Sequence, residues 1–342
     1  MKTVVFKGLG QKLALEERAR PEPGPGEVVI RVAACGVCGS DLHATDAGVF
    51  LQESGTILGH EFSGDVVASG DASIAVGTRV TAVPVNPCGE CRDCREGYTM
   101  LCAQNQITGL AGQAVPGAYA EYVKVPARYV VPLPEGVTYE EGAMVEPLAV
   151  GLHAVNKAGI AVGDRVLIIG AGPIGLSVTS FAKIAGAGHV VVSERAPARL
   201  TAATAFGADA VINAGATDDI GAAFAETAGG PPDVIFDCVG VPGMIQSAIN
   251  LSRARGTIVV VGVCMKEDVQ IPIAAILKEL KIQYILGYQE QDFARVLGFL
   301  QAGRVKPAPM VTDRVSLAAL PDAFEGLRQP GNQIKLMILP QS

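Results

Sequence analysis

Three glycines between an apolar segment and a helical one constrain the fold of this chain more than any other feature. Residues 165–175 read RVLIIGAGPIG, with Gly170, Gly172, Pro173 and Gly175 ahead of a stretch with helical spacing. Glycines at these positions allow a tight turn, a close approach of backbone to a ligand, and close packing of helix on strand. The first N–H groups of such a helix are unpaired and attract an anion. The motif therefore predicts a strand, turn and helix that bind the pyrophosphate of a dinucleotide.

The pattern around this motif predicts the layout of a whole domain. Short apolar segments alternate with helical ones, and strands are expected at 165–169, 189–193, 210–212, 234–237 and 257–263. Strands that are apolar throughout are buried on both faces, which is typical of a parallel sheet covered by helices on each side. We therefore expect an α/β domain with a doubly wound parallel sheet.

The first part of the chain has a different pattern. Residues 1–150 contain short β-rich segments separated by Gly- and Pro-containing turns, which predicts a barrel or sandwich of antiparallel strands. A length of 342 residues suits about two domains. The expected boundaries are 1–150 for the β-rich domain, 151–287 for the nucleotide-binding domain and 288–342 for a C-terminal segment that returns to the first.

Charge and hydropathy exclude several classes of partner. The chain carries 27 Lys and Arg against 34 Asp and Glu, a formal charge of −7, and its basic residues form no long run. Nucleic acids and anionic membranes are therefore not expected as partners. The uncharged segment 166–182 is short of the ~18 apolar residues of a membrane span. Lys7 interrupts the first ten residues, so we expect no signal peptide and a cytoplasmic location.

Four cysteines lie in one polar loop. Cys88, Cys91, Cys94 and Cys102 have the spacing C-x2-C-x2-C-x7-C within a lobe of about residues 86–103. Four thiolates complete a tetrahedral zinc shell and leave no open position for substrate, so this site is expected to be structural. An iron–sulfur cluster uses similar spacing and is the alternative.

A second group of potential metal ligands is dispersed. Cys38, His60 with Glu61, and Glu146 could supply one thiolate, one imidazole and one carboxylate. A set of three ligands leaves the open position that a catalytic zinc needs. Cys35 and Cys38 also form a C-x-x-C pair that could be redox-active, although Cys35 ends an apolar strand and is expected in the core.

The form of the dinucleotide depends on the end of the second parallel strand. Glu194 follows the glycines by about 20 residues, and its carboxylate would accept hydrogen bonds from a ribose 2′-hydroxyl and repel a 2′-phosphate. NAD is therefore expected in preference to NADP. Arg195 and Arg199 lie beside Glu194 and could serve a 2′-phosphate.

Taken in order, these motifs resemble those of the zinc-dependent medium-chain alcohol dehydrogenases. The chain reads CGSDLH at 38–43, GHEFSG at 59–64, the four-cysteine lobe, EPLA at 146–149 and the glycine motif at 170–175. The resemblance covers essentially the whole chain. It implies a GroES-like catalytic domain, a Rossmann domain inserted before the C-terminal segment, one catalytic and one structural zinc per chain, and hydride transfer from an alcohol to NAD.

The resemblance also implies roles for single residues. Glu146 stands where ethanol-oxidising members carry cysteine, as in the sorbitol, threonine and butanediol dehydrogenase branch. Ser40 would receive the proton of the alcohol and His43 would pass it to solvent, while Glu61 would act at the zinc. Further cofactor contacts would come from Ile174, Arg199, Val261, Gly262 and Val263.

The substrate is expected to be a secondary alcohol, a vicinal diol or a polyol. Polyol dehydrogenases carry an arginine before the last helix where this chain reads ILGYQEQDF at 285–293, which favours a smaller diol. A threonine dehydrogenase is the alternative, but the loop 44–58 has no Lys or Arg to bind a carboxylate.

Two other readings remain open at this point. A zinc-free quinone reductase would lack both ligand sets, and a non-catalytic zinc-stabilised nucleotide-binding relative would not need the intact set of catalytic residues. The strand expected near 281–286 could pair with its copy in another subunit, giving a homodimer or homotetramer.

Overall fold

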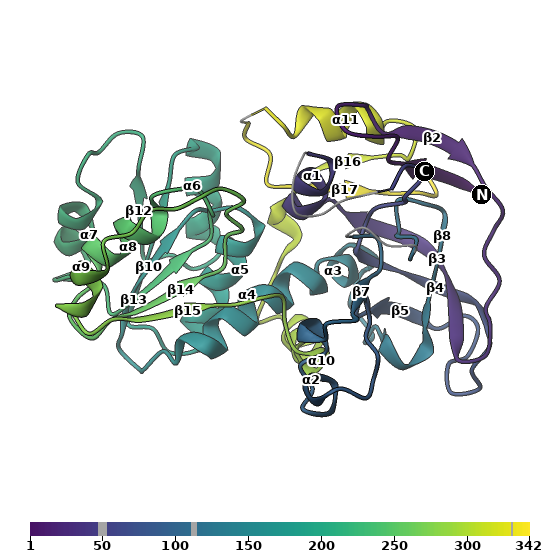
Figure 1. Ribbon diagram of the computed structural model, residues 1–342, viewed down its shortest axis with the longest axis horizontal. Helices are drawn as coiled ribbons and strands as arrows, with labels where there is room; N and C mark the ends of the chain where they lie inside the picture. The colour runs from purple at the N-terminus through teal and green to yellow at the C-terminus, as the bar shows by residue number, and fades with distance from the viewer. Residues whose placement is uncertain (47–52, 111–114, 330) are drawn as a thin grey trace. The chain divides into compact units, whose positions relative to one another are not determined.

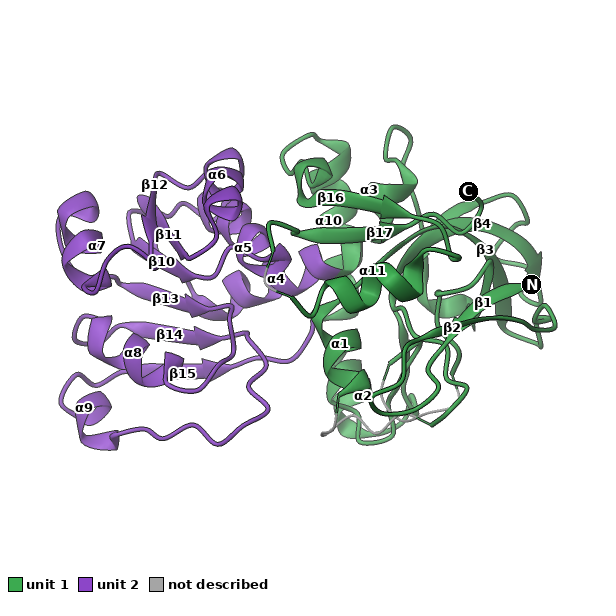
Figure 2. Ribbon diagram, turned by 90° about the horizontal axis from the view of Figure 1, so that it is seen from above, with its two compact units in different colours: residues 1–146, 289–342 green, residues 147–288 purple. Residues whose placement is uncertain are grey.

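The computed structural model describes residues 1–46, 53–110, 115–329 and 331–342, which form two compact units (Figures 1 and 2). Unit 1 contains residues 1–146 and 289–342, so both ends of the chain belong to it, and unit 2 contains residues 147–288. Each unit has a sheet and an apolar core of its own. Within the described ranges, no helix combines the length and the apolar character needed to cross a bilayer.

Unit 2 is built on a six-stranded parallel sheet, as the sequence predicts. The strands in spatial order are β12 (Ala210–Asn213), β11 (His189–Glu194), β10 (Arg165–Ile169), β13 (Val234–Asp237), β14 (Thr257–Val260) and β15 (Lys281–Tyr284). The chain starts at β10, moves outward to β12 and then crosses back to β13. The order therefore reverses between β10 and β13, the place where doubly wound sheets bind ligands.

Helices cover both faces of this sheet. They are α4 (Val145–Ala158), α5 (Pro173–Ile184), α6 (Pro197–Ala205), α7 (Ile220–Ala228), α8 (Met244–Leu251) and α9 (Pro272–Ile276). On one face, Leu167 and Val191 pack with Phe224 of α7 and Ile249 of α8. Alternate residues such as Ile168 point to the other face and are also fully buried, which explains why the strands are apolar throughout.

Unit 1 contains a seven-stranded sheet and two small two-stranded sheets. The main sheet has the order β16 (Val311–Val315), β17 (Lys335–Ile338), β3 (Glu27–Gly36), β4 (Glu61–Ser69), β5 (Arg79–Ala82) and β9 (Val130–Pro132), with β8 (Tyr122–Pro126) also paired to β3. The small sheets are β1 (Lys2–Val5) with β2 (Ala14–Glu17), and β6 (Val85–Asn86) with β7 (Gln106–Ile107). Among the described strands of residues 1–150 all pairs are antiparallel, as the sequence predicts, and the one parallel pair of unit 1, β16 with β17, belongs to the C-terminal segment.

The remaining described helices of unit 1 all have seven residues or fewer, except one that has 12. They are α1 (Gly39–Thr45), α2 (Arg92–Arg95), α3 (Tyr139–Ala143), α10 (Glu290–Gln301) and α11 (Leu320–Gly326), with 3-10 turns at Thr99–Leu101, Ala127–Tyr129 and Ala308–Met310. The helix α11 contributes Phe324 to the same core as Val28 of β3, which joins the C-terminal segment to the N-terminal one.

The register of three strands brings distant residues to one edge of the unit 1 sheet. Gly36, the last residue of β3, pairs with Glu61 at the start of β4 and with Met337 of β17. A Cβ atom on Gly36 would lie 2.1 Å from Oε2 of Glu61, so glycine leaves room for that carboxylate. The chain then turns from β3 through Cys38 directly into α1.

Candidate functional site

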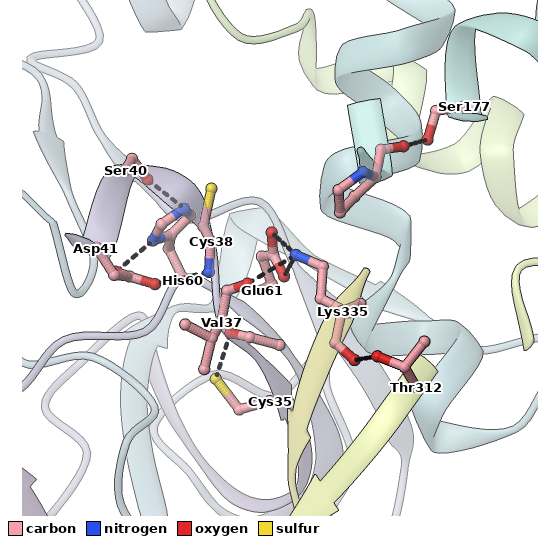
Figure 3. A network of polar contacts seen from close by, with 12 residues as sticks. Cys35, Val37, Cys38, Ser40, Asp41, His60, Glu61, Ser177, Thr312 and Lys335 are labelled. Carbon is pink, nitrogen blue, oxygen red and sulfur yellow. Dashed lines mark hydrogen bonds and ion pairs between the residues drawn. The ribbon is translucent and has the colours of Figure 1, made fainter. Parts of the chain in front are cut away.

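Three of the residues expected at a metal site lie together at this edge. Sγ of Cys38, a ring nitrogen of His60 and a carboxylate oxygen of Glu61 all lie within 4.8 Å of one another (Figure 3). Ligand atoms held tetrahedrally at zinc distances are roughly 3.3–3.8 Å apart, so small adjustments would let this set close on an ion. The sulfur, nitrogen and oxygen donors also match the ligand types of zinc.

The charges around these residues favour a cation. Asp41 is fully buried, and its Oδ1 lies 3.4 Å from Nδ1 of His60. Burial opposes protonation of His60, but Asp41 and then Cys38 outweigh it and hold the pKa of this imidazole well above its usual value. When His60 is neutral, as a metal ligand must be, Asp41, Glu61 and a Cys38 thiolate carry three negative charges against the single positive charge of Lys335. A divalent cation would balance them.

Lys335 is the buried cation of the site. Its Nζ donates hydrogen bonds to both carboxylate oxygens of Glu61, at 2.7 and 2.6 Å, and to the carbonyl oxygen of Val37, at 2.9 Å (Figure 3). Burial lowers the pKa of Lys335, but the carboxylate of Glu61 outweighs this and raises it above the usual value. The lysine therefore stays charged, and both oxygens of Glu61 are engaged.

Glu146 lies outside the group of three. It stands in the first turn of α4, is 8% exposed, and is near enough to Lys335 to contribute to the raised pKa of that lysine. Among the described side chains, the set within 4.8 Å contains Glu61 and not Glu146.

Ser40 and His43 both belong to α1, one turn apart. The hydroxyl group of Ser40 lies 3.3 Å from Nε2 of His60, so it is directly beside the metal-site candidates. His43 is half-buried. Arg328, which follows α11, donates hydrogen bonds to Thr45 and Asp46 at the end of α1 and fixes the helix that carries both residues. Residues 47–52 of the loop expected to follow this helix lie outside the described part of the chain.

The four cysteines of the lobe come together as expected from their spacing. The ligand atoms of Cys88, Cys91, Cys94 and Cys102 lie within 4.8 Å of one another, with the sulfur atoms of Cys91 and Cys94 3.4 Å apart. Backbone N–H groups of Glu90 and Cys91 donate to Cys88 and lower the pKa of its thiol to about 7. Burial, followed by the hydrogen bond with Cys91, raises the pKa of Cys94 to about 12. A closed set of four sulfur atoms fits a structural zinc.

Cys35 does not join either group. It is fully buried at the end of β3, where its thiol donates to the carbonyl of Gly36 at 3.6 Å. Burial raises the pKa of this thiol well above its usual value, which makes it unreactive.

In unit 2 the glycine motif has the geometry that its spacing predicts. Gly170 has a φ of +98°, and a Cβ atom there would lie 2.7 Å from the side chain of Val239, in the loop after β13. A Cβ atom on Gly175 would lie 1.8 Å from the carbonyl oxygen of Gly170. Gly172 has open space around it, and Pro173 begins α5 with Ile174 in its first turn.

Glu194 ends β11 and lies against the glycine loop. Its Oε2 accepts a hydrogen bond from the N–H group of Ala171 at 2.9 Å, and its Oε1 accepts from Arg195 and Ala196 at 2.6 and 3.0 Å. The carboxylate is thus held beside the motif, where a ribose hydroxyl group would compete for its oxygens. Arg199 lies in the first turn of α6.

The loops after β13 and β14 complete this end of the sheet. Asp237 accepts hydrogen bonds from the N–H groups of Val239 and Gly240, at 2.9 and 3.2 Å. The N–H groups of Val261 and Gly262 donate to the carbonyl oxygen of Asp237. β14 ends at Val260, three residues before the end expected from the sequence. Burial raises the pKa of Asp237. Val263 is 46% exposed at the same end of the sheet.

Sequence reasoning missed three residues of the unit 1 site: Asp41, Tyr119 and Lys335. Asp41 had a signal in the sequence, because it lies three residues after Cys38, the spacing at which a side chain can cap the start of a helix. In the structure its carboxylate accepts the N–H group of Cys38 at 2.9 Å. Lys335 interrupts the apolar run 334–339, and a charge in such a run needs a buried partner. Tyr119, whose hydroxyl group donates to Asp41 at 2.7 Å, gave no signal in the sequence.

Comparison with known proteins agrees with these observations. Residues 24–135 match the family model described as alcohol dehydrogenase GroES-like domain, and residues 173–302 match the model described as zinc-binding dehydrogenase. The sorbitol dehydrogenase of Bacillus subtilis (strain 168) is 34% identical over 337 residues, with 96% of this chain and 95% of that protein covered.

Solved structures of similar proteins cover nearly the whole chain. The 2R,3R-butanediol dehydrogenase of Bacillus subtilis superposes with a TM-score of 0.89 at 33% identity, covering 99% of both chains. An alcohol dehydrogenase of Escherichia coli CFT073 complexed with NADH gives 0.90 at 30% identity, again with 99% of both chains covered. A zinc-binding dehydrogenase of Sinorhizobium meliloti 1021 bound to NADP gives 0.91 at 31% identity and the same coverage.

Both family models, the similarity along the whole chain and the two clustered ligand sets agree with the resemblance read from the sequence. The chain belongs to the zinc-dependent medium-chain alcohol dehydrogenase family, with a GroES-like fold in unit 1 and a Rossmann fold in unit 2.

Proposed function

We propose that this protein is a zinc-dependent dehydrogenase that oxidises a secondary hydroxyl group of a diol or polyol to a ketone and reduces NAD. The convergence of Cys38, His60 and Glu61 at one edge of unit 1 carries the proposal. Similarity to sorbitol and butanediol dehydrogenases supports the substrate class, and it does not favour the threonine alternative.

Cys38 and His60 are the proposed direct ligands of the catalytic zinc. The carboxylate would come from Glu61 or Glu146, directly, through water or in exchange. Because both oxygens of Glu61 bind Lys335, Glu61 can approach an ion only by weakening that pair. With zinc bound, the site gains a Lewis acid that lowers the pKa of an alcohol hydroxyl group, and with NAD bound it gains a hydride acceptor.

The residues of α1 would move the proton. Ser40 is placed beside His60 and would accept the proton from the substrate hydroxyl group. His43, one turn further along α1, would pass it to solvent, since an imidazole ring can both accept and release a proton. The contacts of Arg328 with Thr45 and Asp46 would keep this path in place.

Unit 2 would bind NAD in preference to NADP. The pyrophosphate would lie at Gly170, Gly172 and the first turn of α5, with Pro173, Ile174 and Gly175 shaping that turn, and the ribose hydroxyl groups would bind Glu194. Contacts from Arg199 and from Val261, Gly262 and Val263 are proposed for the rest of the cofactor. Because similar structures contain NADH and NADP, the preference rests on the carboxylate of Glu194.

The second zinc would be structural. We propose that it binds Cys88, Cys91, Cys94 and Cys102, in a lobe of about residues 86–103 of the catalytic domain. The proposed domains are 1–150 and 288–342 for catalysis and 151–287 for NAD. A thiol set arranged for a metal ion suits a reducing compartment, which supports a location in the cytoplasm.

A screen of NAD reduction tests the activity. Butanediols, sorbitol and other polyols, simple secondary alcohols and threonine would be compared with and without a strong chelator. We expect turnover with a diol or polyol, loss of that turnover in chelator, and a much lower kcat/KM with NADP. Ser40→Ala should lower kcat while leaving two zinc ions per chain. Freshly purified protein without zinc, or equal rates in chelator, would contradict the proposal.

A further inference from the structure

A tyrosine outside the set of proposed ligands completes a buried chain of polar groups that ends at His60. The chain starts at the hydroxyl group of Tyr119, which donates to Oδ2 of Asp41 at 2.7 Å. The same oxygen accepts the N–H group of Cys38 at 2.9 Å. The other oxygen, Oδ1, faces Nδ1 of His60 at 3.4 Å. Tyr119, Asp41 and His60 are all at least 96% buried.

The contact between Asp41 and His60 selects one form of the imidazole. Oδ1 of Asp41 and Nδ1 of His60 are both buried, and neither has a hydrogen-bond partner among the described residues. A proton on Nδ1 would satisfy both atoms. The lone pair of the neutral ring then lies on Nε2, the nitrogen that faces Ser40. A carboxylate behind a histidine ligand fixes its tautomer and makes it a better donor to a metal.

Tyr119 holds the carboxylate of Asp41 in this position, and the backbone of Tyr119 is itself fixed by hydrogen bonds. Its N–H group donates to the carbonyl of Leu58 at 2.9 Å, and its carbonyl accepts from Val4 at 2.8 Å. Its ring packs on Gly59, where a Cβ atom would lie 2.4 Å from the ring. The residue therefore contacts the backbone just before His60 with its ring and contacts Asp41 with its hydroxyl group.

Tyr119 contributes through its ring and through its hydroxyl group, and removing the hydroxyl oxygen separates the two contributions. The ring fills the space over Gly59 and belongs to the core of unit 1. The hydroxyl group adds one charge-assisted hydrogen bond and orients Asp41, because Oδ2 is then fixed by two donors and Oδ1 remains for His60. Phenylalanine at this position would keep the first contribution and remove the second.

We propose that the Tyr119 hydroxyl group is a positioning group for the catalytic metal, acting through Asp41 on His60. This inference rests on the proposed function, because it assumes that His60 binds zinc. Outer-shell partners of this kind change metal affinity by about 10- to 100-fold. As Tyr119 is one step further from the metal, we expect the lower end, about 10-fold, for Tyr119→Phe.

Zinc transfer to a coloured chelator measures the effect without using activity. The full-length protein is loaded with zinc, and the dissociation constants of the two ions are determined at a temperature where every variant is folded. Tyr119→Phe should weaken the more labile ion about 10-fold and leave the four-cysteine ion unchanged. With cobalt in the labile site, the visible spectrum of this variant should also shift. Asp41→Asn should give a larger effect on the same ion.

Tyr139→Phe is the matched control. Its hydroxyl group donates to Asp65 of β4, so the variant also loses a hydrogen bond from tyrosine to carboxylate within unit 1, away from the proposed ligands. It should leave both zinc constants unchanged.

The outcomes separate this inference from the proposed function. If wild-type protein binds only the four-cysteine zinc, the proposed function fails. If wild-type protein binds two ions and Tyr119→Phe releases both with unchanged constants, the positioning role of Tyr119 is wrong. Equal weakening of both ions would mean that Tyr119 supports only the fold of unit 1.

Discussion

Lys335 shows how one buried charge can hold a site together. An ammonium group that is 2% exposed loses its hydration, and this cost is offset only because Glu61 and the carbonyl of Val37 take its hydrogen bonds. The lysine also joins β17 to β4, across 274 residues of sequence. Removing one partner leaves the other charge buried without compensation.

Lys335→Met should therefore destabilise the zinc-free protein by about 3–5 kcal/mol, since Glu61 would be left unpaired. Denaturation by urea in the presence of chelator measures this loss. Lys124→Met is the control, because Lys124 pairs with Glu27 at a similar 2.8 Å but both side chains are about one-third exposed. That pair should contribute less than about 1 kcal/mol. The double variant with Glu61→Gln should recover most of the stability, and no recovery would contradict this account.

At this scale the sequence predicts the groups that form motifs and misses those that support them. Cys38, His60 and Glu61 lie in recognisable segments, and the structure places them together. The partners of these residues come from elsewhere, and Tyr119 is 78 residues from Asp41. Pairing over such distances is decided by sheet register and not by local pattern.

The turn between β10 and α5 has two glycines that are needed for different reasons. At Gly175 a side chain would collide with the backbone carbonyl of Gly170, at 1.8 Å, so the requirement belongs to the fold. At Gly172 a Cβ atom would meet nothing within 4 Å, so the requirement would come from the ligand.

Alanine at each position should separate the two requirements. Gly175→Ala should lower the stability of unit 2 by about 1–3 kcal/mol, the usual cost of overpacking. Gly172→Ala should leave the melting temperature unchanged and weaken NADH binding, measured by quenching or enhancement of nicotinamide fluorescence. Equal NADH affinity in Gly172→Ala and wild-type protein would show that the pyrophosphate does not approach this residue.

Three segments of unit 2 are joined by Asp233. Its carboxylate accepts hydrogen bonds from Arg165 of β10 and from Arg253 beyond α8. Burial raises the pKa of Asp233, but these hydrogen bonds outweigh it and lower the value to about 2, from an ordinary 3.8. The ionised form is therefore favoured in the folded state.

Because the folded-state pKa is lowered, the contribution of Asp233 to the free energy of unfolding is complete above about pH 4 and declines as the pH falls towards 2. Asp233→Asn should cost about 1–2 kcal/mol at pH 7 and less as the pH approaches 2. Urea denaturation of both proteins across this range measures the difference. If the free energies of unfolding of wild-type protein and Asp233→Asn differed by the same amount at pH 7 and pH 2.5, packing and not charge would be responsible.

Elements with strong periodicity are predictable, and their ends depend on tertiary contacts. The expected strands 165–169 and 234–237 match β10 and β13 residue for residue. The strand expected to reach residue 263 ends at Val260, because the next two N–H groups turn to Asp237. Periodicity within a strand cannot reveal a hydrogen bond to a neighbouring loop.

For the whole molecule, sequence order alone does not give the arrangement of the strands. The parallel sheet of unit 2 follows from apolar strands alternating with helices, but nothing local places β17 between β3 and β16. The same limit applies to association between chains. The sequence predicts a strand near 281–286 that could pair with its copy, but it does not show which residues around that strand are exposed. The structure adds the exposure of the residues around that strand.

Unit 2 has an edge suited to a second copy of the chain. β15 is the last strand of the parallel sheet. Large apolar side chains between residues 269 and 286 are more than half exposed, and they are Val269, Ile271, Ile273, Ile276, Leu277, Tyr284 and Leu286. An edge strand with apolar surroundings tends to pair with another strand. We propose that β15 pairs with its copy in a homodimer, or in a dimer within a homotetramer.

The backbone of β15 supplies a specific test. Lys281 donates its N–H group to Gly256, just before β14, and Ile285 donates to Val260 of β14, so in alternation the N–H group of Tyr284 points away from the sheet. Tyr284→Pro should remove that donor without breaking the intrachain ladder and should shift the mass in light scattering towards the 35.2 kDa of one chain. Tyr284→Thr keeps the N–H group and loses the ring, so it should remain associated. Wild-type protein that is monomeric at all concentrations would exclude the pairing, and dissociation by Tyr284→Thr alone would assign association to the ring and not to the strand.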